Sequence, residues 1–422
     1  MRKKGFTPKA RVSPSNVYLR GKTDWRQKQA ELFIRGEIEV PEYDYELLQN
    51  YVRKELLKDV DVLTEDLNRL VMHKASSALE ETVNLLQKHK IEQEIVERYL
   101  LRAAAELLAD PGSEGLLNAY IRRNIEVYGE YDVNLSRQVI QGSLAKDLEN
   151  DYRDTIEFYR SVARRKFYPL LSLLDNLRDD ERVNAERATE LINNYLHARG
   201  LSQLGWIASI SPEAIIVHTK YRTREIVIPK NFDRTVSQLR RLMVHEVEAH
   251  AARYEHGLDE KFPIVATGTV SSKKINEGLG IFLELLIDQS PVSEHPALRR
   301  ALHRYAALCF ALDTSEDTTS TKHIFKQLFK FMHDEEFNEK KHAGPSISKE
   351  ALETYAVFDN VYRGSDFRHP KAVYMRGKNY LEGLIAVLTY LSEAELHEST
   401  FDLMFRGTID FTSRLERSML DL

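Results

Sequence analysis

The spacing of two histidines, His245 and His250, constrains the fold of this chain more than any other feature. Both lie in the run Leu-Met-Val-His-Glu-Val-Glu-Ala-His-Ala-Ala-Arg at 242–253. An α-helix turns by about 100° per residue, so side chains five positions apart point about 140° away from each other. One additional residue in a turn, a π-bulge, would bring both imidazoles to the same face, and such bulges occur mostly at functional sites. We therefore predict a bulge or an unwound turn at residues 247–249.

The residue types around this spacing are those of a catalytic zinc site, which uses nitrogen ligands, a carboxylate and an open position for water. The zinc-peptidase motif HExxH has a glutamate directly after its first histidine, and Glu246 occupies that position here. A further carboxylate, Glu277, follows later in the chain. The pattern favours His245, His250 and Glu277 as metal ligands. The alternative is that the two histidines are unrelated and that Glu246 and Glu248 face solvent.

Glu277 belongs to a second helical pattern, which begins with Ile-Asn-Glu-Gly-Leu-Gly at 275–280. Apolar side chains recur there at helical spacing, at Ile275, Leu279, Phe282 and Leu286. Gly278 and Gly280 would each cost about 1 kcal/mol in a helix interior. We expect a close approach to the histidine helix to offset this cost. The alternative is that Glu277 lies on a solvated helix face.

His256 is a rival for the position of third ligand, because it follows His250 with the spacing of the third histidine in metzincins. Those proteins need a glycine three residues after the second histidine, where this chain has Arg253. We interpret Gly257 as the cap that ends this helix. Glu277 is therefore preferred to His256.

These motifs, together with Val-Tyr-Arg-Gly at 361–364 and Tyr374, resemble the QEGLA-motif proteins. That family is described as modulating flavohaemoglobin expression and is related to the microtubule-associated tyrosine carboxypeptidases. The resemblance covers roughly residues 40–420, and Asn276 and Gly280 replace the Gln and the last Ala of QEGLA. The segment is also similar to the NEGFA ligand segment of gluzincin aminopeptidases.

The resemblance implies a carboxypeptidase that depends on one Zn²⁺ per chain. It implies that His245, His250 and Glu277 hold the zinc and that Glu246 is the catalytic residue. The substrate would be a peptide or protein C-terminus, with a terminal tyrosine or another aromatic residue. The alternatives are an endopeptidase or aminopeptidase on the same site, or a regulatory zinc protein without turnover.

Carboxypeptidase chemistry requires a donor for the developing oxyanion and a cation for the terminal carboxylate. Tyr374 and Arg363 are candidates for the donor, because both lie in the segment that carries the resemblance. Arg363 and Arg376 are the preferred substrate-binding residues, and Lys273 and Arg222 are further candidates. The sequence leaves open a structural ion pair for Arg363 and a packed core position for Tyr374.

The composition narrows the class of protein. The 60 basic and 65 acidic residues give a net charge of −5, which argues against general binding of nucleic acid. The chain has a single cysteine, Cys309, so it cannot form an intramolecular disulfide, which fits a reducing cytoplasm. The apolar residues around Cys309 predict that it is buried. No apolar run approaches the length of a membrane span, so we expect no membrane segment.

Three regions follow from the order of the patterns. We expect residues 1–40 to form a basic, mobile arm, which lacks the apolar stretch of a secretory signal. Residues 41–202 read as helical, and residues 203–422 as a zincin-like metallopeptidase region. Short β-branched runs at 206–210, 214–219 and 225–228 predict a small sheet, after which Asp233 would cap the histidine helix. The expected fold is α+β and predominantly α-helical: a helical region, then a zincin-like catalytic core with a small β-sheet beside the metal-binding helix.

Overall fold

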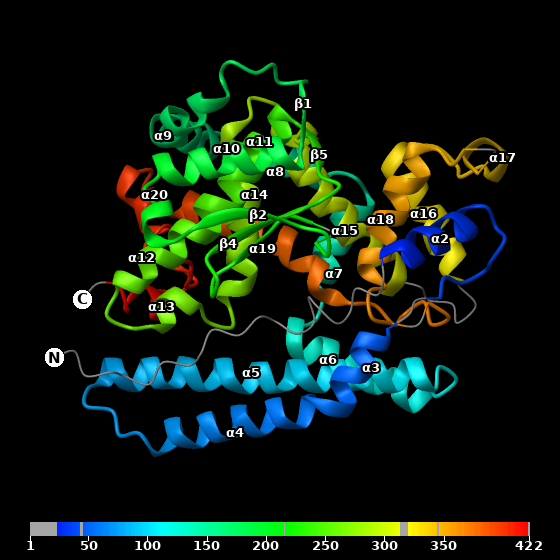
Figure 1. The fold of residues 1–422 in the computed structure, drawn as a ribbon, viewed down its shortest axis with the longest axis horizontal. Helices are drawn as coiled ribbons and strands as arrows, with labels where there is room; N and C mark the ends of the chain where they lie inside the picture. Colours follow the sequence, from blue (N-terminus) through cyan, green and yellow to red (C-terminus); the bar gives the residue numbers. More distant parts are fainter. Residues whose placement is uncertain are drawn as a thin grey trace.

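The computed structural model describes residues 23–42, 45–214, 216–312, 320–343, 346–365 and 367–420, and Figure 1 shows their arrangement. Helices predominate and the strands are short, so the predicted α+β and mainly helical class is confirmed. The zincin-like character of the core stays a prediction. None of the helices in these ranges combines the length and the apolar character that a bilayer crossing requires.

Four helices near the N-terminus form a separate layer, here called the helical lobe (Figure 1). They are α3 (Glu46–Lys54), α4 (Leu56–Met72), α5 (Ala78–Ala109) and α6 (Glu114–Tyr128). α5 begins at Ser77, whose side chain accepts a hydrogen bond from the backbone N–H of Glu80. The lobe has its own apolar cluster, which includes Leu100, Tyr120 and, from far along the chain, Tyr374. A C-terminal segment is therefore part of the lobe's core.

The first described helix, α2 (Thr23–Ile34), packs away from the helical lobe (Figure 1). Its Phe33 is buried in the main core and stacks on Phe358 of α18 (Lys349–Val361), with ring centroids 5.5 Å apart. Residues 1–22 of the predicted basic arm lie outside the described residues. The remainder of that arm is folded from Thr23 to Ile34, because its apolar residues are covered by the core.

The middle of the chain supplies four helices to the main core. They are α7 (Val133–Ile140), α8 (Leu144–Asp151), α9 (Arg153–Leu171) and α10 (Ala185–Ala198), with short 3₁₀ turns at η1 (Ser172–Leu174) and η2 (Ser202–Leu204). A strand, β1 (Arg182–Asn184), precedes α10 and pairs antiparallel with β5 (Asp233–Thr235). Cys309 is buried, as predicted.

The predicted small sheet is confirmed. Its strands are β2 (Ile207–Ser211), β3 (His218–Lys220) and β4 (Glu225–Pro229), in the order β2-β4-β3. β2 runs parallel and β3 antiparallel to the central β4. The prediction that Asp233 caps the next helix is wrong: Asp233 lies in β5, and its carboxylate pairs with Arg182 at 2.5 Å. Thr235 is the N-cap and forms a capping box with Gln238.

The helix that follows contains three consecutive sections. They are α11 (Val236–Met243), the π-helix η3 (Val244–Ala252) and α12 (Arg253–Asp259). Gly257 does not end this helix, contrary to the prediction, because it lies inside α12. A Cβ atom there would lie 2.6 Å from Cα of Ala266, so the glycine allows close packing against α13 (Ile264–Thr267).

The C-terminal part is also helical, and α14 (Ser272–Ile287) runs through its centre, packed between η3 and α19 (Lys378–Glu393). The other helices are α15 (Pro296–Leu312), α16 (Thr321–His333), α17 (Glu339–His342), α20 (Glu398–Leu403) and α21 (Arg414–Arg417), with 3₁₀ turns η4 (Val292–Glu294) and η5 (Met375–Gly377). The expected close approach to the histidine helix is confirmed for Gly280, where a Cβ would overlap the His245 ring. Gly278 instead faces Gly383 of α19.

Candidate functional site

The π-helix brings the two histidines of the motif together. Its hydrogen bonds run from residue i to i+5, so side chains five positions apart lie on one face. The rings of His245 and His250 have their centroids 5.2 Å apart. The bulge predicted at residues 247–249 lies inside η3 and is confirmed.

Glu277 of α14 completes a cluster with these two histidines. One ligand atom from each of His245, His250 and Glu277 lies within 4.8 Å of the other two. All three side chains come from elements that pack directly on each other, η3 and α14. Two imidazole nitrogens and one carboxylate are the donor set of catalytic zinc sites, so the chemistry of these residues fits this metal.

Each histidine ring is oriented by a hydrogen bond at its Nδ1 atom. Nδ1 of His245 lies 2.9 Å from a carboxylate oxygen of Glu284. Nδ1 of His250 lies 3.3 Å from the hydroxyl of Tyr221. These contacts leave Nε2 of each ring for a ligand, which is the usual arrangement of metal-binding histidines. Burial, with the charge of His245, lowers the pKa of His250 to about 3.

Glu284 is a residue of the site that sequence reasoning missed. Its other oxygen accepts a hydrogen bond from Arg300 of α15 at 2.7 Å, and its side chain is buried. Burial works to raise the pKa of Glu284, but Arg300 and His245 lower it to about 2. Glu284 lies two helical turns after Glu277, on the same face of α14, and this spacing was a signal in the sequence.

Glu246 lies beside the cluster and contacts the small sheet. Thr219 of β3 donates a hydrogen bond to its carboxylate at 2.7 Å. Burial raises the pKa of Glu246 to about 7. A carboxylate with a pKa near neutrality can accept and return a proton at physiological pH.

Among the predicted substrate-binding residues, Arg376 reaches the cluster. Arg376 of η5 donates to Glu277 at 3.3 Å. Arg363 follows α18 and donates to the side chain of Asn360, and its buried Nε has no hydrogen-bond partner. Burial lowers the pKa of Arg363 to about 10, and the nearby charge of Arg376 contributes. Both guanidinium groups are half-buried.

Tyr374 points into the helical lobe. It is 2 % exposed, and its hydroxyl accepts a hydrogen bond from Tyr128 at 2.8 Å. Tyr374 precedes Arg376 by two positions in the chain, so its contact with Tyr128 holds the segment that carries Arg376.

The other sequence candidates lie outside the cluster. Lys273 pairs with Glu97 of α5 at 3.6 Å, and Arg222 is exposed in the turn between β3 and β4. His256, the rival ligand, has its Nδ1 2.8 Å from the carbonyl oxygen of Phe405. The preference for Glu277 over His256 therefore agrees with the geometry.

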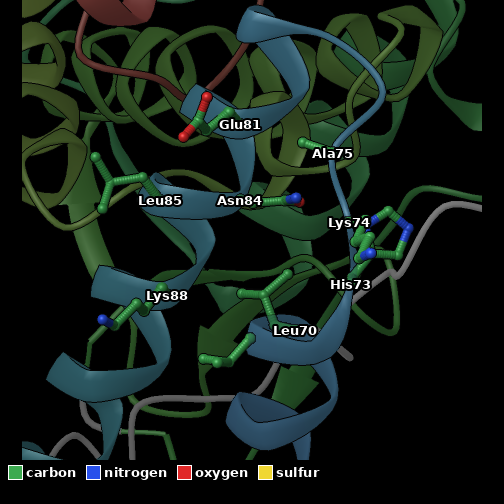
Figure 2. A pocket seen from close by; sticks show the side chains of 9 residues that line it. Leu70, His73, Lys74, Ala75, Glu81, Asn84, Leu85 and Lys88 are labelled. Atoms are coloured by element: carbon green, nitrogen blue, oxygen red, sulfur yellow. The ribbon is translucent and has the colours of Figure 1, made fainter.

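A cavity of about 480 Å³ lies at the tip of the α4–α5 hairpin and shares no residue with the cluster. Figure 2 shows its lining, which combines apolar and charged side chains of the two helices and of the loop that joins them. Among its labelled residues are Leu70, Lys74, Glu81, Leu85 and Lys88. The lining includes His73 and Glu81, but the group of described residues suited to a metal is His245, His250 and Glu277.

The fold and the cluster define a mainly helical α+β protein with an HExxxH motif and a downstream glutamate brought to one point. Comparison with known families identifies it further: the family model of the microtubule-associated tyrosine carboxypeptidases matches residues 171–416, and the chain belongs to this family. The predicted relation to tyrosine carboxypeptidases is confirmed, and membership makes the chain a peptidase of the carboxypeptidase kind. Neither the curated proteins nor the solved structures gave a match. The matched residues contain the cluster but not the helical lobe.

Proposed function

We propose that this protein is a zinc-dependent carboxypeptidase of the cytoplasm that removes a C-terminal tyrosine or other aromatic residue from a peptide or protein. The observation that carries the proposal is the convergence of His245, His250 and Glu277 within 4.8 Å, with Glu246 beside them. The family supports the reaction class. The donor set supports the metal.

The residues around the cluster have separate tasks in this proposal. Zinc, when bound, lowers the pKa of a coordinated water to about 7 and polarises the scissile carbonyl. Glu246, held by Thr219, takes a proton from the attacking water and passes it to the leaving amine. β3 is an edge strand of its sheet, so an extended substrate can pair with it through main-chain hydrogen bonds.

In this proposal, Arg363 and Arg376 give the enzyme its preference for the C-terminus of a peptide. Within the described residues, Arg363 pairs with no carboxylate, and Arg376 makes one ion pair, with Glu277. Two half-buried guanidinium groups with few anionic partners favour a carboxylate, which an arginine can hold with two parallel hydrogen bonds. The α-carboxylate of a peptide is an anion of this kind, whereas an internal peptide segment has none.

The test is the metal content of the purified protein, followed by peptide cleavage. We expect about one zinc per chain in the wild type and its loss in both His250→Ala and Glu277→Ala. The zinc-loaded wild type should release tyrosine from a peptide with a free C-terminal carboxylate and not from the same peptide as an amide. Absence of zinc after metal-replete preparation would overturn the proposal. Equal cleavage of the amide would mean that the protein is an endopeptidase and not a carboxypeptidase.

Replacing Glu284 by glutamine is expected to weaken zinc binding by about 10- to 100-fold, because His245 loses the anionic partner that orients its ring. The measurement is competition with a chelator of known affinity. Glu416→Gln is a matched control, since Glu416 is a buried glutamate hydrogen-bonded to Thr269 and Ser271 and not to the cluster. Unchanged zinc affinity in Glu284→Gln would show that the ring is held by packing alone.

A further inference from the structure

The C-terminal end of α6 holds the segment that carries Arg376. Three hydrogen bonds join them: Met375 N–H to Asn124 Oδ1 at 3.3 Å, the Tyr128 hydroxyl to the Tyr374 hydroxyl at 2.8 Å, and Lys378 Nζ to the Glu130 carbonyl oxygen. Asn124 and Tyr128 are one helical turn apart and so lie on one face of α6. The contacts all lie between residues 124–130 and residues 374–378, so the two short segments form one junction.

This junction is buried. Asn124, Tyr374 and Lys378 are all less than 5 % exposed, and the rings of Tyr128 and Tyr374 meet edge to face with centroids 5.3 Å apart. Burial raises the pKa of Tyr128 well above its ordinary value, so its hydroxyl keeps the proton that it donates. A buried polar contact of this kind fixes one geometry, because breaking it removes the acceptor that the buried Tyr128 hydroxyl uses here.

The junction is connected to the cluster through Arg376, which lies between two anchored residues, Tyr374 and Lys378. Tyr374 is held by α6, and Arg376, two residues later, donates to Glu277 at 3.3 Å. Lys378 anchors the other side of Arg376, through Glu130 and through an ion pair with Glu382 at 3.4 Å. The backbone on both sides of Arg376 is thus fixed by groups that include the helical lobe.

We infer that the helical lobe is a working part of the site and that Tyr128 is a positioning residue, which sets Arg376 for the α-carboxylate of the substrate. The inference rests on the proposed function. It extends the site beyond residues 171–416, since α6 lies outside the part that the family model matches. Tyr374 is thereby assigned to holding this segment and not to donation towards the oxyanion.

Tyr128→Phe tests the inference, because it removes one hydroxyl and keeps the ring. We expect the affinity for a peptide with a free C-terminal tyrosine to fall by about three- to tenfold, the effect of one hydrogen bond. The affinity is measured by calorimetric titration of the zinc-loaded protein in a Glu246→Gln background, where the peptide stays intact. In the active background KM should rise by a similar factor, while kcat and zinc affinity stay within about twofold. Binding of the amide peptide should not change.

Tyr51→Phe is the matched control, since Tyr51 is a buried tyrosine of the same lobe whose hydroxyl donates to Asp59 at 2.6 Å. It should leave peptide affinity unchanged. Tyr374→Phe should add little to Tyr128→Phe, because the two variants break the same hydrogen bond.

The outcomes separate this inference from the proposed function. If the wild type cleaves the free peptide and Tyr128→Phe binds it like Tyr51→Phe, the positioning role is overturned and the proposed function stands. An equal loss of affinity for the acid and the amide would also overturn it, since the effect would not concern the carboxylate. If the zinc-loaded wild type neither binds nor cleaves a peptide, the positioning role of Tyr128 and the proposed function are both overturned.

Discussion

Replacing Glu246 by glutamine is expected to lower peptide hydrolysis by about 10²- to 10⁴-fold while zinc stays bound. Glutamine has the size of glutamate, and its carbonyl oxygen can still accept the hydrogen bond from Thr219. It cannot take a proton from water, so the step assigned to Glu246 is lost. The zinc content should not change, because Glu246 is not one of the three proposed ligands. The measurements are the rate of tyrosine release and the zinc content of the same preparation.

Glu248 provides the control within the same helix. It is two residues from Glu246 and fully buried, but it accepts hydrogen bonds from Tyr195 at 3.0 Å and from Arg199 at 3.2 Å. Glu248→Gln should reduce stability, because the half-buried Arg199 loses its charged partner, and should leave hydrolysis per folded molecule unchanged. Activity of Glu246→Gln near the wild-type level would show that the proposed mechanism is wrong. Loss of zinc from that variant would mean that Glu246 helps to assemble the cluster.

The centre of the site could be predicted because it depends on local helix geometry. An HExxxH spacing leaves few ways to bring two imidazoles together, and the π-helix at Val244–Ala252 is one of them. The small sheet could also be predicted from the sequence, because its short β-branched runs are bounded by turns. Two of the corrections concern helix ends. Asp233 and Gly257 are residue types that often cap helices. Asp233 instead forms an ion pair with Arg182, and Gly257 allows close packing against Ala266.

The surroundings of the site could not be predicted, because they depend on contacts between distant segments. Glu284 acts on His245 only because α14 packs on η3, and Arg300 reaches Glu284 from a third helix. Tyr128 and Tyr374 are far apart in the chain, and no periodicity relates them. Such pairs follow from tertiary packing, which residue spacing does not contain.

Replacing Gly278 by alanine is expected to destabilise the protein by about 3 kcal/mol or more. Gly278 of α14 and Gly383 of α19 face each other where the two helices meet. A Cβ atom at Gly278 would overlap the backbone carbonyl of Gly383, and one at Gly383 would overlap the carbonyl oxygen of Lys274. Backbone atoms cannot move aside as a flexible side chain does, so the two helices must separate and lose the packing between them. The measurement is the free energy of unfolding in denaturant.

Gly115→Ala is the control for the helix propensity of the substitution. Gly115 lies in α6 and is exposed, and the nearest atom to a Cβ there is Ser113 Oγ at 3.9 Å. Alanine at that position should stabilise the protein by about 0.4–1 kcal/mol, so the two variants should differ in sign. Gly278 adjoins Glu277, so the separation of α14 from α19 should also displace a proposed ligand and weaken zinc binding. A Gly278→Ala variant as stable as the wild type would mean that α14 and α19 pack less closely than described, and that Glu277 is positioned by other contacts.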